Sequence, residues 1–183
     1  MIMLILGVAL WWGAHLYKRL APEQRAAMGN SGRGLMTLLL VVSVILMVLG
    51  YRSAEGQVWW GRSPALVGIN NLLVLVAFYF FAADGMKTRI TRHLRHPQLT
   101  GFALWAFAHL VPNGDLPSFV LFGGLLVWAL VEMVVINRAQ PDWTPPAGPF
   151  PARKEIMAVA GAVVVLLVVG LIHAWLGYNP FGG

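Results

Sequence analysis

The sequence predicts an all-α integral membrane protein with about six transmembrane helices. Of its 183 residues, 58% are hydrophobic and only 11% are charged, whereas soluble domains carry about 25% charged residues. The mean hydropathy is +0.72. Six apolar stretches alternate with polar connections; they cover residues 2–16, 35–51, 66–83, 99–111, 116–137 and 156–178. We therefore expect residues 1–183 to form a single transmembrane domain.

The apolar stretches differ in how well they suit a full membrane crossing. The first, 2–16, has no positive residue before its apolar core and no small-residue cleavage site after it, which predicts a retained helix and not a signal peptide. Several stretches fall short of the ~20 residues that a perpendicular crossing needs, so flanking turns or a thinned bilayer must complete them. The stretch 99–111, between Pro97 and Pro112-Asn113-Gly114, is the least suited to a full crossing.

The distribution of positive charge predicts the topology. Lys and Arg gather in the first, third and fifth connections, as Lys18, Arg19, Arg25, Arg33, Lys87, Arg89, Arg92, Arg95, Arg138, Arg153 and Lys154. The positive-inside rule places these connections in the cytoplasm and both termini outside. The net charge of +6 is dispersed among loops, so it does not indicate a nucleic-acid partner. We expect a multi-pass protein of a bacterial inner membrane.

A ten-residue pattern occurs twice, at 7–16 and 101–110, with the shared spacing Gly-x3-Trp-x3-His. Residues four apart are neighbours on a helix surface, so this spacing aligns a gap, an indole ring and an imidazole on one face. A chance match is the alternative, because Gly, Ala, Leu and Trp are common in membrane helices. If three helices carry each copy, the two halves form a 3+3 inverted repeat.

The two histidines of this pattern, His15 and His109, are the predicted metal ligands, and Trp11 and Trp105 are predicted to flank the cofactor. A histidine in hydrocarbon needs a partner, which can also be a backbone carbonyl. Counting ~1.5 Å per residue separates the two histidine Cα atoms by about 10 Å across the membrane. This separation suits one haem between them. The chain has no cysteine, so that haem is a b-type group without covalent attachment.

Glu132 is the one acid deep in an apolar stretch and is predicted to contribute to cofactor binding. Its carboxylate could accept the second ring N–H of His15 and so orient the imidazole. A salt bridge to Arg95 or Arg138 is the alternative.

Arg95 and His96 precede Pro97, which suits the first turn of a helix. A helix N-terminus attracts anions, so this pair is predicted to bind a haem propionate or a lipid phosphate. Helix initiation alone is the alternative. His96 and His173 are further candidate ligands for a second haem.

Several motifs together resemble the NnrU family. They are Gly-Ala-His-Leu at 13–16, Arg-His-Pro-Gln-Leu-Thr-Gly at 95–101, Leu-Trp-Ala-Phe-Ala-His-Leu at 104–110, Asn-Gly-Asp-Leu at 113–116, Val-Leu-Phe-Gly at 120–123 and Ile-His-Ala-Trp-Leu-Gly at 172–177. The resemblance implies a bacterial inner-membrane protein of denitrification and nitric oxide metabolism. It also implies kinship with plant zeta-carotene isomerase, a haem b enzyme whose two iron ligands match His15 and His109.

Three functions remain open. The first is redox or gas-ligand chemistry at a bis-histidine haem b. The second is an assembly or accessory factor for nitric oxide or nitrite reductase, and a homo-oligomer is compatible with either. The third is an enzyme, either carotene-isomerase-like or dependent on S-adenosylmethionine. Arg95-His96-Pro97-x3-Gly101 resembles a motif of membrane methyltransferases, but Leu99 replaces their tyrosine and their later Arg and paired Glu residues are missing.

Overall fold

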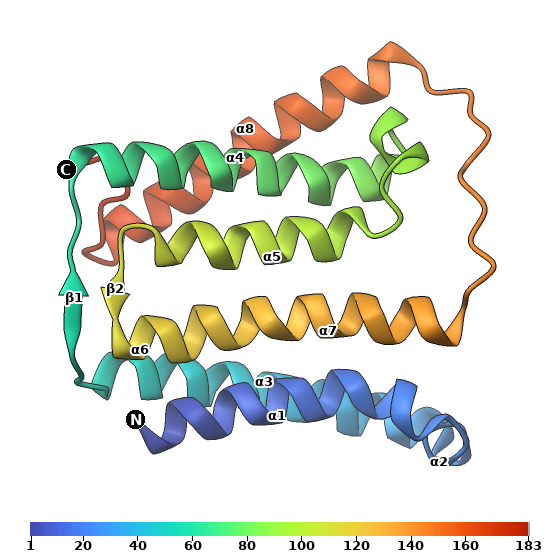
Figure 1. The fold of residues 1–183 in the computed structure, drawn as a ribbon, viewed down its shortest axis with the longest axis horizontal. Coiled ribbons are helices and arrows are strands. Elements are labelled where there is room, and N and C mark those ends of the chain that lie inside the picture. The colour runs from blue at the N-terminus through green and yellow to red at the C-terminus, as the bar shows by residue number, and fades with distance from the viewer. Residues whose placement is uncertain (183) are drawn as a thin grey trace.

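The computed structural model describes residues 1–182, and within them six helices of 14 residues or more lie side by side (Figure 1). They are α1 (Ile2–Leu20), α3 (Gly29–Ser53), α4 (Pro64–Met86), α5 (Pro97–Leu110), α7 (Gly124–Ala139) and α8 (Ala152–Trp175). The all-α prediction is thereby confirmed. Each of the six contains most of one predicted apolar stretch.

Short elements connect these helices. They are α2 (Pro22–Ala27), the 3-10 turn Arg89–Arg92, the strands β1 (Val58–Trp60) and β2 (Gly114–Asp115), α6 (Leu116–Ser118) and the π-helical turn Phe119–Gly123. The last two continue into α7, so Leu116–Ala139 forms one rod. The rod begins at Asp115, whose side chain accepts the Ser118 backbone N–H at 2.8 Å, as an N-cap residue does.

The two strands form an antiparallel ribbon that was not expected from the sequence. In this ribbon Gly114 lies opposite Trp60, and a Cβ on Gly114 would overlap the indole ring. Strands of three and two residues are too short to show the period-2 alternation by which a strand is recognised.

Successive long helices run in alternating directions (Figure 1). As a result, residue 1 and residues 179–182 lie at the same end of the molecule, on the left of the view, together with β1 and β2. The three Lys- and Arg-rich connections, around α2, around Arg89–Arg92 and at 138–154, lie at the opposite end. The arrangement separates the basic connections from the termini.

Four helices are long and apolar enough to cross a membrane: α3, α4, the rod Leu116–Ala139 and α8. Their apolar side chains stay exposed, for example Leu38 at 58% on α3 and Leu171 at 67% on α8, as lipid-facing residues do. The chain is therefore a membrane protein. The helices α1 and α5 do not meet this criterion, and α5, with 14 residues, spans only about 21 Å.

Contacts between helices place them in the order α3, α1, α7, α5, α4, α8. Glycines of the repeated pattern allow two of these contacts. A Cβ on Gly7 would lie 2.8 Å from the Met47 backbone of α3, and one on Gly101 would lie 2.7 Å from the Ala77 carbonyl oxygen of α4. Gly7 thus faces the helix that follows its own, whereas Gly101 faces the helix that precedes it. A 3+3 inverted repeat would require equivalent neighbours, so the similarity stays local.

Candidate functional site

His15 and His109 have the same local geometry. The imidazole Nδ1 of His15 lies 2.9 Å from the Trp11 carbonyl oxygen, and that of His109 lies 2.8 Å from the Trp105 carbonyl oxygen. Because a carbonyl only accepts, each Nδ1 carries the proton and donates it. Each Nε2 therefore keeps a lone pair, the atom with which a neutral imidazole binds a metal. The indole four residues earlier packs on each imidazole, with ring centroids 4.2 and 4.8 Å apart.

The structure does not bring these two histidines into one cavity. His15 lines a cavity bounded by α1, α4, α5 and α7, and His109 lines another between α4, α5 and α8. Aromatic rings fill the space between them. The ring centroid of Trp128 lies 4.6 Å from that of His15 and 5.1 Å from that of Phe102. The Phe102 centroid in turn lies 5.3 Å from that of Trp105. A single haem between His15 and His109 would have to displace these rings. The predicted separation of about 10 Å between the two histidine Cα atoms depends on the backbone alone. It therefore gives no information about the α7 side chains that lie between them.

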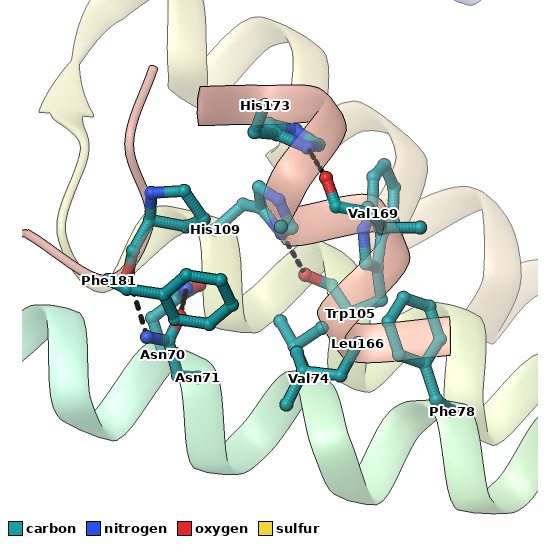
Figure 2. Close-up of a pocket in the computed structure, with 12 residues that line it drawn as sticks. Asn70, Asn71, Val74, Phe78, Trp105, His109, Leu166, Val169, His173 and Phe181 are labelled. Atoms are coloured by element: carbon teal, nitrogen blue, oxygen red, sulfur yellow. Dashed lines mark hydrogen bonds between the residues drawn. The ribbon is translucent and has the colours of Figure 1, made fainter. Parts of the chain in front are cut away.

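His109 shares its cavity with His173 of α8 (Figure 2). The Nδ1 of His173 donates to the Val169 carbonyl oxygen at 2.8 Å, so this imidazole also leaves Nε2 free. His109 and His173 each lie near the C-terminal end of their helix, at the end of the molecule that holds the termini. His173 lies outside the repeated pattern, because Val169, and not a tryptophan, precedes it by four residues.

The His109 cavity has a volume of about 60 Å³ and mainly apolar walls. Trp105, Phe78 and Leu166 line it. The segment after α8 closes one side, since Asn71 donates to the Pro180 carbonyl oxygen at 2.7 Å.

Arg62 also holds this segment, through a 2.8 Å bond from its Nη2 to the Asn179 carbonyl oxygen. Asn71 and Arg62 thus both bind the C-terminal segment.

Glu132 lies beside His15, in the same cavity, as the sequence predicted. The predicted bond from His15 does not form, because Nδ1 is already bonded to the Trp11 carbonyl. Glu132 pairs instead with Arg19, with 3.5 Å between Oε1 and Nε, and neither Arg95 nor Arg138 is its partner. Trp11 lines this same cavity.

Arg95 and His96 connect α5 to the end of α7. The Arg95 guanidinium donates to the Gln140 carbonyl oxygen, and His96 Nε2 lies 2.9 Å from Asn137 Oδ1. Pro97 occupies the first turn of α5. These contacts join α5 to the end of α7, and the role of both residues in cofactor binding stays a prediction.

The described residues hold no cluster of three or more His, Cys, Asp or Glu side chains that could bind a metal ion. A metal bound by these residues would therefore have only one or two side-chain ligands, as haem iron does.

Residues 3–180 match the family model described as NnrU protein. The match covers nearly the whole chain. No curated protein and no solved structure matches it.

Proposed function

Because the chain belongs to the NnrU family, we propose that it is an inner-membrane protein of denitrification and nitric oxide metabolism that binds one haem b between His109 and His173. One observation carries the choice of site: two imidazoles from different helices line one cavity, each with a free Nε2. His109 is a ligand in both this proposal and the sequence prediction, and His173 takes the place of His15 as the second ligand.

The residues of the cavity fit a haem. Two neutral imidazoles are a common pair of haem ligands, and the absence of cysteine in the sequence excludes thiolate ligation and covalent attachment. The ring of Trp105 and the side chains of Phe78 and Leu166 offer an apolar wall to the porphyrin. The cavity measures about 60 Å³, so the C-terminal segment that closes one side must shift outward to admit the porphyrin. When bound, haem would supply an iron that can carry one electron and bind a gas.

The chain's own residues would do three things. His109 and His173 hold the iron, and the Trp105 and Val169 carbonyls fix the orientation of the two imidazoles. Asn71 ties the C-terminal segment across the cavity, which excludes water. By the positive-inside rule, the basic connections face the cytoplasm and the cavity lies in the outer half of the membrane.

The test of the haem site is the absorption spectrum of purified variants. We expect about one haem per polypeptide and a low-spin spectrum after reduction. His109→Ala and His173→Ala should each lose haem or become high-spin. His15→Ala, a substitution in the other cavity, should keep the spectrum. Loss of haem from His15→Ala with full retention in His173→Ala would refute this choice of ligands, and a colourless purified protein would refute haem binding.

Nitric oxide separates gas chemistry from an accessory role. We expect nitric oxide to change the spectrum of the reduced protein, because it can replace one of two neutral imidazoles at ferrous iron. His93→Ala, a substitution in the basic connection, serves as the control and should respond as the unaltered protein does. A haem-bearing protein whose spectrum does not change with nitric oxide would instead favour an assembly factor for nitric oxide or nitrite reductase.

A further inference from the structure

The cavity beside His15 holds most of the unpaired polar atoms of the molecule. In residues 1–182, five buried side-chain N or O atoms lack a hydrogen-bond partner: Trp11 Nε1, Asn70 Oδ1, Thr88 Oγ1, Trp128 Nε1 and Glu132 Oε2. Three of them belong to residues that line this one cavity. An unpaired buried polar atom costs about 1–3 kcal/mol, and native proteins rarely leave several together without a ligand or water.

Two of the three residues that carry these atoms are buried, and Trp11 is partly buried. Trp128 is 4% exposed and Glu132 is 7% exposed. Both extend from α7, whereas Trp11 extends from α1, so the unpaired atoms come from two packed helices. Each of the three atoms exposes less than 1 Å² of surface, so a partner must displace part of the cavity wall to reach them.

The donors and acceptors define the chemistry of that partner. Trp11 and Trp128 offer N–H donors, and Glu132 Oε2 and His15 Nε2 offer acceptors. The partner must both accept and donate hydrogen bonds, as a hydroxyl group does. Arg19 pairs with the other oxygen of Glu132, so the charge is already balanced and a neutral ligand is favoured.

The remaining walls indicate a ring. Phe81, Leu99 and Phe102 line a cavity of about 350 Å³, and aromatic walls pack well on a flat ring. Four helices that face lipid elsewhere bound it, so the ligand is expected to arrive from the bilayer.

We propose that this cavity binds the hydroxylated ring of a lipid-soluble phenol, the chemical class that includes membrane quinols. The ring hydroxyl donates to Glu132 Oε2 or His15 Nε2, and its oxygen accepts an N–H from Trp11 or Trp128. Binding is reversible and no covalent bond changes. The site is separate from the His109 cavity, so its test does not depend on whether the protein binds haem.

The test uses the indole N–H signals of ¹⁵N-labelled protein in nanodiscs, since eight tryptophans give eight such signals. Trp11→Phe and Trp128→Phe assign the two signals of the cavity. We expect decylubiquinol to shift both signals and to leave that of Trp60 in place, because Trp60 Nε1 is already bonded to the Val111 carbonyl oxygen at 2.9 Å. The dimethyl ether of the same quinol, which cannot donate, should shift neither.

A redox-inert phenol, 4-decylphenol, separates two sources of the ligand. A shift with both compounds indicates recognition of the phenol itself, whereas a shift with decylubiquinol alone narrows the ligand to quinols. Glu132→Gln should weaken binding about tenfold through loss of a bond to a charged acceptor. The matched control is Glu155→Gln, because Glu155 lines a different cavity. Unmoved Trp11 and Trp128 signals, or equal shifts with the dimethyl ether, would overturn the proposal and leave ordered water as the partner.

Discussion

At the scale of single residues, one hydrogen bond accounts for the ambiguity of the histidines. His15, His109 and His173 each donate Nδ1–H to the carbonyl four residues earlier. From the sequence, a bond to the backbone and a role as a ligand were treated as alternatives. They are compatible, because imidazole has two nitrogens and the backbone bond uses only one.

A single amide governs access to the His109 cavity. Asn71→Ala removes the 2.7 Å bond to the Pro180 carbonyl, and loss of about 1 kcal/mol should raise the open population of the C-terminal segment about fivefold. The chain has no cysteine, so Val74→Cys, a cavity position 6% exposed, reports opening through its rate of maleimide labelling. Asn137→Ala at the other end of the bundle should leave this rate unchanged. Equal rates in the two double variants would contradict the role of Asn71.

At the scale of elements, the sequence predicts where each helix lies along the chain, but it does not predict which helices pack against each other. Long apolar stretches, Pro97 and the cap residue Asp115 mark helix positions within a few residues. The pairing of His109 with His173 depends on α8 packing against α4 beside α5, and local spacing carries no information on that. The ring of Trp128, which separates His15 from His109, was missed for the same reason.

Close packing of α5 on α4 gives a second prediction. Gly101→Ala places a Cβ 2.7 Å from the Ala77 carbonyl oxygen and 3.1 Å from the Phe80 Cβ, so the helices must separate at a cost of about 1–3 kcal/mol. Gly13→Ala is the matched control, since nothing lies within 4 Å of its Cβ and alanine favours a helix. The midpoint of thermal unfolding in detergent should fall for Gly101→Ala alone. A similar midpoint for both variants would show that this contact is not tight.

At the scale of the whole molecule, the alternation of helix directions assigns the two cavities to opposite halves. His109 lies next to the last residue of α5, at the end that holds the termini, whereas His15 lies five residues before the end of α1, at the end of the basic connections. The rings of Trp128, Phe102 and Trp105 connect the cavities through contacts of 5.1 and 5.3 Å. The core is thus shared by both sites, and a substitution at Phe102 should affect both.

The orientation of the molecule is set by its charges and is open to a direct test. Glu55, before β1, and Asp142, in the long connection before α8, are exposed positions at opposite ends. The positive-inside rule places Glu55 outside and Asp142 in the cytoplasm. In the cysteine-free chain, a membrane-impermeant maleimide should label Glu55→Cys in spheroplasts and should label Asp142→Cys only after lysis. The reverse pattern would place the His109 cavity in the cytoplasmic half, and a nitric oxide site there would face the opposite compartment.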